Sequence, residues 1–379
     1  MIPSPARAAL AGIGLVTVTA LAGCGTQTPE EKSGGAIAVD AGDKACKVAR
    51  TNADAGTLTF EVTNTGSRVT EFYLYAEGDR IMGEVENITP GLTRRLIVEV
   101  SEAGDYQTAC KPGMRGDGIR GAFTVSGQAD RHVDTDTKLA EAAASYQRYV
   151  NSQTGALVTK TGEFVAAVKA GKVDEAKALY PVTRIYWERI EPVAESFGDI
   201  DPKIDVREDG LEQGMEFTGF HRLEKDLWST GVRADSASIA DRLLADVKDL
   251  QARAKTVEPS PLRMAGGAKE LLDEVATGKV TGEEDRYSHT DLWDFRSNVD
   301  GSQAAVAALR PVIEERDPDL LSTLDERFHA VDVLLEKHRE GDGFALYTEL
   351  TPTEVKELSE VVDALGEPIS QVAEVVAGQ

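Results

Sequence analysis

The first part of the chain alternates between apolar and polar residues, a pattern typical of β-strands. Residues 57–63 alternate with a period of two and stop at the turn residues 64–66. Further short apolar runs follow at 71–75, 96–100 and 122–125, each bounded by Gly, Asp or Pro. Several short strands at this spacing predict a β-sandwich, which we assign to residues 37–127.

Beyond residue 132, apolar residues recur every three or four positions. The first such series places its apolar members on one face of a long helix that ends at residues 170–172. Its members are Leu139, Ala143, Tyr146, Val150, Leu157, Phe164 and Val168. Similar patterns recur near 174–197, 234–255, 303–316, 318–339 and 353–376. Short Gly/Pro connections between long amphipathic helices predict an antiparallel bundle at residues 133–378. The expected fold is therefore a β-domain followed by an all-α domain.

The N-terminal segment is interpreted as an export signal. Residues 1–23 carry one charge, Arg7, and an apolar run at 8–22 that is short for a membrane-spanning helix. The following Leu-Ala-Gly-Cys at 21–24 resembles a bacterial lipobox, in which the cysteine is acylated and becomes the mature N-terminus. We expect Cys24 to carry a lipid, residues 24–36 to form a flexible tether, and the protein to be held at the outer face of the bacterial cytoplasmic membrane. An ordinary secretory signal with an unmodified cysteine is the alternative.

The formal charge of −24 narrows the range of ligands. Binding to nucleic acid or to anionic lipid requires a concentrated Lys/Arg surface, which this acidic chain does not offer. A surplus of carboxylates suits hard cations, which prefer oxygen ligands, although it also suits a merely solvated surface.

The most informative motif is H-x-x-E at His221 and Glu224. One helical turn separates the two residues, so both side chains can reach the same ion. Metal sites in helical bundles combine such a pair with acids from facing helices. The acids that the sequence offers for this role are Glu188, Glu191, Asp205 and Asp291. Glu188 and Glu191 could instead form ion pairs with Arg184 or Arg189, and a lone H-x-x-E could lie on a solvated helix face.

The two remaining cysteines, Cys46 and Cys110, form a pair once Cys24 is acylated. In an exported protein such a pair is most often a disulfide, and in the reduced state it could supply soft ligands for copper. Glu71 and Glu84, together with Glu86 and these cysteines, are candidates for a second metal site in the β-domain. Exposed strand carboxylates without a metal are the alternative. Residues 37–127 contain no histidine, which argues against a type 1 copper centre.

Three separated segments carry a resemblance to a known family. Residues 186–199, 219–224 and 287–295 together resemble the imelysin (M75) family, and more closely the EfeO-type proteins of Efe iron-uptake systems. The resemblance covers about 133–378, and residues 37–127 resemble the cupredoxin-like domain that precedes the imelysin domain in that type. It implies an iron-binding lipoprotein in which His221 and Glu224 contribute to the metal site, with Glu188, Glu191 and Asp291 as further candidates.

The same resemblance implies partners and a cargo. The cargo would be iron, as Fe²⁺ or Fe³⁺, with copper or zinc as alternatives. The implied partners are an EfeU-type membrane permease and an EfeB-type haem peroxidase.

Two other functions compete with iron binding. The imelysin family is classed among peptidases, so a metal-dependent peptidase is one alternative. A zinc peptidase normally shows H-E-x-x-H, whereas His221 has no second histidine close to it in sequence. A single histidine among carboxylates suits iron or a harder ion better than zinc. The other alternative is a binding module for a different ligand, such as an anionic polymer, with a purely structural metal.

Overall fold

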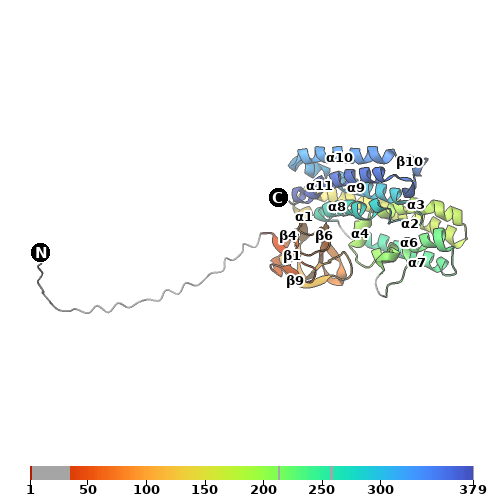
Figure 1. Cartoon of the computed structure of the whole chain (residues 1–379). Coiled ribbons are helices and arrows are strands. Elements are labelled where there is room, and N and C mark those ends of the chain that lie inside the picture. Colours follow the sequence, from red (N-terminus) through yellow and green to blue (C-terminus); the bar gives the residue numbers. More distant parts are fainter. Residues whose placement is uncertain (2–34, 212–213, 257–258, 379) are drawn as a thin grey trace. The chain divides into compact units, whose positions relative to one another are not determined.

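The β-strands of the N-terminal part form two sheets that pack face to face. The computed structural model describes Met1 and residues 35–211, 214–256 and 259–378 (Figure 1). One sheet has the order β2 (Cys46–Val48), β1 (Ile37–Ala41), β4 (Gly56–Asn64), β7 (Thr93–Val100). The other has the order β3 (Asn52–Asp54), β9 (Ile119–Gln128), β8 (Glu102–Cys110), β5 (Thr70–Tyr75), β6 (Ile81–Ile88). The expected β-sandwich is confirmed.

The core of the sandwich follows from the alternation seen in the sequence. On β4 the side chains of Leu58, Phe60 and Val62 are buried, and the residues between them are partly exposed. The Phe60 ring lies 5.2 Å from that of Phe72 and 5.4 Å from that of Phe123, so it joins the two sheets across the core. The pairs β1/β4 and β3/β9 are parallel, and the other pairings in the two sheets are antiparallel.

A disulfide bond also joins the two sheets. Cys46 on β2 is bonded to Cys110 at the end of β8, with the two Cα atoms 5.5 Å apart. Both sulfur atoms are used in this bond, so neither cysteine offers a thiolate to copper or another metal.

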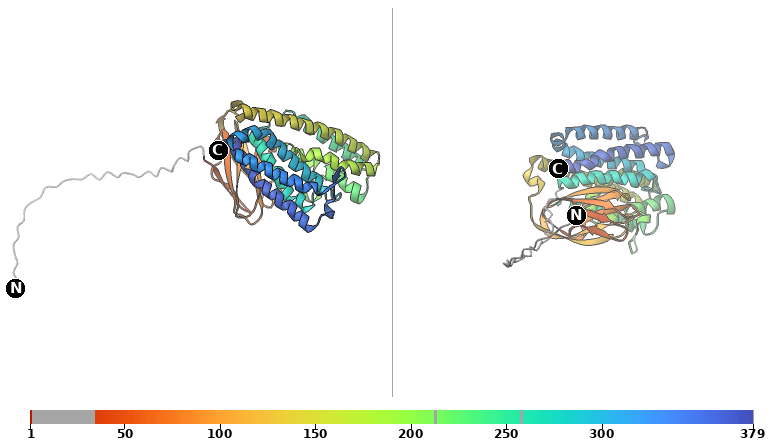
Figure 2. Two further views of the ribbon diagram at one scale, coloured as in Figure 1. Left: turned by 90° about the horizontal axis from the view of Figure 1, so that it is seen from above. Right: turned by 60° about the vertical axis from the view of Figure 1, so that its left-hand side comes forward.

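The remaining chain is mostly helical, as expected. The helices are α1 (His132–Thr135), α2 (Thr137–Lys169), α3 (Val173–Glu188), α4 (Glu191–Glu195), α5 (Asp201–Ile204), α6 (Gly219–Lys225), α7 (Ser236–Ala254), α8 (Pro261–Thr277), α9 (Asp291–Arg316), α10 (Pro318–Glu336) and α11 (Pro352–Ala377). Both views of Figure 2 show the long helices running side by side. All seven residues predicted for the buried face of the first long helix are buried on α2. This part of the fold prediction is confirmed.

Three features of the helical part depart from the sequence prediction. The pattern at 174–197 is divided into α3 and α4, because Ile190 leaves the helical conformation (φ −133°, ψ 11°) just before Pro192. Helix α8 was not predicted, and α9 begins at Asp291 rather than near residue 303. A two-stranded ribbon, β10 (Arg339–Glu340) and β11 (Gly343–Phe344), follows α10.

The sandwich packs directly on the helices. Strands β6 and β7 contact α8, and β7 also contacts α11, so residues 36–379 form one compact unit. The outer face of β5 is covered as well, since Tyr73 and Tyr75 are buried there beside Ala109. The predicted signal and Cys24 lie outside the described residues. None of the helices in the described part has both the length and the apolar character needed to cross a membrane.

Candidate metal centre

A glycine at the start of α6 allows this helix to pack closely against the backbone of Lys203 and Ile204. Gly219, the first residue of α6, has φ +79°, and a Cβ atom there would lie 2.1 Å from the carbonyl oxygen of Ile204. Thr218 strengthens the contact, because its hydroxyl donates to the carbonyl of Lys203 at 2.9 Å. The approach places Asp205, which follows Ile204, beside His221 on the first turn of α6.

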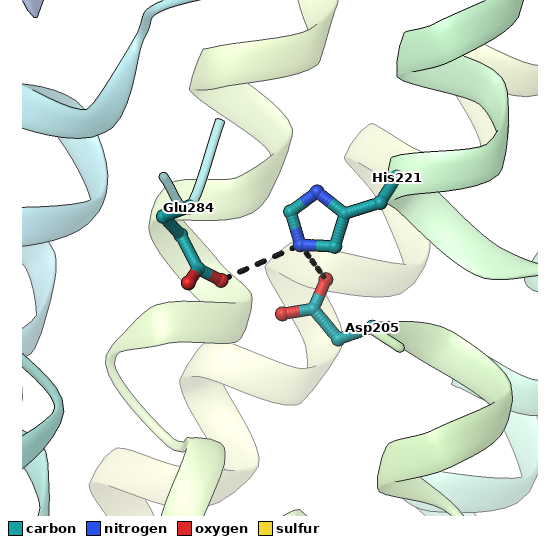
Figure 3. Close-up of side chains that lie close together, drawn as sticks. All are labelled: Asp205, His221 and Glu284. Atoms are coloured by element: carbon teal, nitrogen blue, oxygen red, sulfur yellow. Dashed lines mark ion pairs between the residues drawn. The ribbon is translucent and has the colours of Figure 1, made fainter. Parts of the chain in front are cut away.

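Three donor atoms from distant segments meet at one side of the His221 ring (Figure 3). The Nε2 atom of His221 lies 3.5 Å from Oδ1 of Asp205 and 3.4 Å from Oε1 of Glu284. All three residues are buried, and His221 is only 1% exposed. Within the described residues, Nε2 of His221 has no hydrogen-bond partner. One nitrogen and two carboxylates therefore surround a point at which a cation can bind, in a donor set that iron accepts.

The other ring nitrogen of His221 is held by Glu224. Oε2 of Glu224 lies 3.2 Å from Nδ1, and the hydroxyl of Tyr180 is 3.4 Å from the same nitrogen. The second carboxylate oxygen of Glu224 accepts hydrogen bonds from the backbone N–H groups of Tyr287 and Ser288 and from the Ser288 hydroxyl. Glu224 thus fixes the imidazole and ties it to the loop that carries Glu284. Such a carboxylate–histidine pair orients a metal-binding histidine.

The site also contains its own cation. The guanidinium of Arg184 is fully buried and forms ion pairs with five carboxylates. They belong to Glu188, Asp205, Glu284, Asp285 and Asp294. Asp205 accepts a further bond from Nε1 of Trp187 at 2.7 Å. Arg184 therefore balances part of the negative charge that converges here, and it fixes Asp205 in position.

Burial and the surrounding charges alter the acidity of the site. Burial opposes the charged form of His221, but Asp205, Glu224 and Glu284 together raise the pKa of His221 to about 10. Burial also acts against the charged Glu284, yet Lys279, His221 and Arg207 hold the pKa of Glu284 well below its ordinary value. A metal ion that binds Nε2 would therefore have to displace the proton that these carboxylates favour.

Two predicted ligands lie in a neighbouring group instead. Glu188 and Glu191 are gathered with Glu274 around the buried ammonium of Lys279. The Nζ atom of Lys279 is 2.8 Å from Glu188, 3.2 Å from Glu191 and 2.8 Å from Glu274. Glu188 also pairs with Arg184, which was the alternative weighed for it from the sequence. Neither Glu188 nor Glu191 belongs to the groups of possible ligand atoms that include His221.

Asp291 lies behind the site rather than in it. Its Oδ1 atom accepts a bond from the backbone N–H of Asp285 at 3.2 Å, and its Oδ2 atom is buried without a partner in the described part of the chain. Burial and the neighbouring Asp285 raise the pKa of Asp291 to about 8. Asp291 thus supports the loop that presents Glu284 and Asp285.

Sequence reasoning missed the third member of the site, Glu284. A signal was available, because the acidic run at 283–285 is separated by a single residue from the segment at 287–295 that carries the family resemblance. Lys279 was missed as well, although it neutralises two of the acids that were predicted as ligands.

The second metal site predicted for the β-domain is not assembled as expected. The disulfide removes Cys46 and Cys110 from any ligand set. Glu71 accepts a bond from the Tyr73 hydroxyl at 3.1 Å, whereas Glu84 faces Arg263 on α8 at 3.4 Å. Glu84 therefore has its partners in the helical part, not among the cysteines.

Comparison with known proteins agrees with both parts of the fold. A family model described as imelysin matches residues 142–372, and a cupredoxin-like domain model matches residues 13–125. Over 342 residues the chain is 40% identical to the "Iron uptake system component EfeO" of Escherichia coli O157:H7, covering 89% of this chain and 90% of that protein. The chain belongs to the EfeO branch of the imelysin family. The EfeO proteins of Escherichia coli K12 and Shigella flexneri match with the same identity and coverage.

Family membership bears on the site in one respect. The imelysin match spans every member of the His221 group, and the match to EfeO extends over most of the chain, so the site belongs to the region shared with these iron-uptake components.

Proposed function

We propose that this protein acts in bacterial iron uptake by capturing iron in the helical domain. The ligands would be Nε2 of His221 and carboxylate oxygens of Asp205 and Glu284, and iron would be the cargo rather than a resident cofactor. The observation that carries the proposal is the buried Nε2 atom without a hydrogen-bond partner, which faces two carboxylates. The name of the EfeO relatives, iron uptake system component, supports iron as the metal.

The acidic surface supports this role. A net charge of −24 raises the local concentration of cations and speeds their encounter with the protein. Inside the site, Arg184 and, when protonated, His221 limit the repulsion among the carboxylates before iron binds. The site can therefore exist folded without iron and still bind it when the imidazole loses its proton.

Peptide hydrolysis fits the site less well than binding does. A peptide bond would have to reach a histidine that is 1% exposed, beside carboxylates that are engaged by Arg184 and Arg207. A metal ion needs much less room than a peptide. The same burial disfavours a polymer ligand that contacts the metal.

We further propose the cellular setting that the resemblance implies. Cys24 would anchor the protein by a lipid to the outer face of the cytoplasmic membrane. The iron would pass from the His221 site to an EfeU-type permease, and an EfeB-type haem peroxidase would act in the same system. In this arrangement the protein binds and transfers iron and performs no catalysis.

Isothermal titration calorimetry of iron into the whole protein tests the central step. Fe²⁺ is titrated under anaerobic conditions and Fe³⁺ as its citrate complex, into wild type, H221A and E284Q. We expect saturable binding that is lost in H221A and weakened at least tenfold in E284Q. The matched control is H329A, since His329 is an exposed histidine on α10. Equal binding by wild type and H221A would refute the proposal.

A further inference from the structure

A second group of carboxylates lies where the β-sandwich packs on the helices. Glu84 on β6, Glu195 on α4 and Glu270 on α8 each place an oxygen within 4.8 Å of the other two. Glu84 and Glu270 are buried, and Glu195 is half-buried. This group contains none of the residues around His221.

One arginine serves two of these three acids. The guanidinium of Arg263 lies 3.4 Å from Oε1 of Glu84 and 3.0 Å from Oε1 of Glu270, and it also donates to the carbonyl of Pro192. Among the described residues, no basic side chain forms an ion pair with Glu195. If all three acids are ionised, Arg263 balances only one of their three negative charges. A cation of charge two or more would balance that excess.

Glu270 points independently to a missing partner. Glu270 is 5% exposed, and its Oε2 atom makes no hydrogen bond to any described residue. A buried carboxylate oxygen without a hydrogen-bond donor loses its contacts with water and makes no other contact in their place. This raises the free energy of the folded state unless a cation or a proton binds to the oxygen. Oε1 of the same side chain is already taken by Arg263, so Oε2 is the atom available for a ligand.

Two cavities are lined by members of the group. One, of about 330 Å³, is lined by Glu84 and Glu195 together with Tyr73, Tyr75 and Asp201. The other, of about 440 Å³, is lined by Glu84 and Glu270 together with Glu86 and Asp273. Glu84 lines both cavities, so an ion that enters either one can reach this carboxylate.

We propose that Glu84, Glu195 and Glu270 form a second cation site that joins the β-sandwich to the helical domain and takes a hard, multivalent, oxygen-preferring ion. All three donors are carboxylates, the ligand type that such ions prefer over nitrogen or sulfur. The site differs from the one expected in the β-domain, because only Glu84 is shared and the other two ligands come from helices. It does not depend on the His221 site.

Counting bound ions tests this site in the full chain. Wild type, H221A, E195Q and the double variant H221A/E195Q are dialysed to equilibrium against iron(III) citrate, and iron per chain is measured by mass spectrometry. E195Q is chosen because it leaves both ion pairs of Arg263 intact. The matched control is E163Q, an exposed glutamate on α2 paired with Lys160. Circular dichroism checks that each variant is folded, and E270Q provides a second ligand variant.

The expected result is two ions in wild type and E163Q, one in H221A, one in E195Q and E270Q, and none in the double variant. If wild type and H221A each bind one ion and E195Q binds none, the result would support this site and refute the iron proposal for His221. If folded E195Q and E270Q bind as many ions as wild type, the second site does not exist.

Discussion

Gly219 lies so close to Ile204 that any side chain at position 219 would collide with the Ile204 carbonyl oxygen. The contact matters because the two residues flank the metal centre. Ile204 directly precedes Asp205, and Gly219 begins the helix that carries His221. Asp205 and His221 are 16 positions apart in the chain, and their contact thus depends on the absence of one methyl group at position 219.

The substitution G219A should damage both the fold and the site. A Cβ atom 2.1 Å from a carbonyl oxygen, at a φ of +79°, forces α6 away from Asp205. We expect a loss of about 3 kcal/mol in the free energy of unfolding and at least a tenfold loss of iron affinity. Thermal unfolding and calorimetry measure the two effects. G162A is the control, because its Cβ on α2 meets no atom within 4 Å, and it should be neutral or slightly stabilising.

The substitution E224Q distinguishes an orienting residue from a ligand. Glu224 contacts the Nδ1 atom of His221, on the opposite side of the ring from Asp205 and Glu284. Removing its charge should weaken iron binding about 10- to 100-fold without abolishing it. D205N removes a proposed ligand on the Nε2 side and should weaken iron binding more than E224Q does. Calorimetry on both variants decides the matter, since equal losses would make Glu224 a ligand.

Arg184 should be essential to the stability of the iron-free protein. In R184Q the buried carboxylates of Glu188, Asp205 and Asp294 lose their common partner. We expect destabilisation of about 3–5 kcal/mol in denaturant unfolding, part of which added iron should restore because it binds only the folded state. The exposed pair of Arg310 and Asp325 offers a control, and R310Q should change stability by less than about 1 kcal/mol. Comparable stability of R184Q and R310Q would contradict this view of the site.

Glu71 should make stability fall as the pH rises. Burial, with a contribution from Glu84, raises the pKa of Glu71 from its ordinary 4.5 to about 7 in the folded protein, against the attraction of Lys111. The folded state therefore keeps a proton that the unfolded state releases. This contribution to stability is complete below pH 4.5 and is lost as the pH rises to about 7.

The measurement compares wild type with E71Q at several pH values. Glutamine cannot ionise. Between pH 4.5 and about 7, the free energy of unfolding of E71Q should therefore rise by about 2–3 kcal/mol relative to that of wild type. The partly exposed Glu61 on β4 provides a control variant, E61Q. A constant difference between wild type and E71Q across this range would show that folding does not raise the pKa of Glu71.

The sequence predicted the helices and strands that have one buried face and one exposed face. Helix α2 presents one apolar face to the core, and β4 alternates between core and surface, so both have a clear period. The first half of α9 was missed because it buries polar side chains, among them Asp294, Asn298 and Ser302. A helix that is buried together with its hydrogen-bonding partners has no apolar period to detect.

The candidate metal centre could be predicted from the sequence only where its residues are close together in the chain. The pair His221 and Glu224 follows from helical spacing within one turn. Glu284 comes from a loop 63 positions after His221, and only the packing of α6 against that loop brings them together. The same limit explains why Glu191 was proposed as a ligand, since its partner Lys279 lies 88 positions away.

The disulfide between Cys46 and Cys110 has a consequence for damage to the chain. The bond encloses the exposed turn at residues 89–92, which is the kind of place where proteases cut. After a single cut there, the two fragments stay covalently joined, and the strands on either side keep their own partners, β6 with β5 and β7 with β4. A nicked molecule would migrate as intact protein on a denaturing gel until a reducing agent is added, so a single cut in this turn does not release the N-terminal fragment.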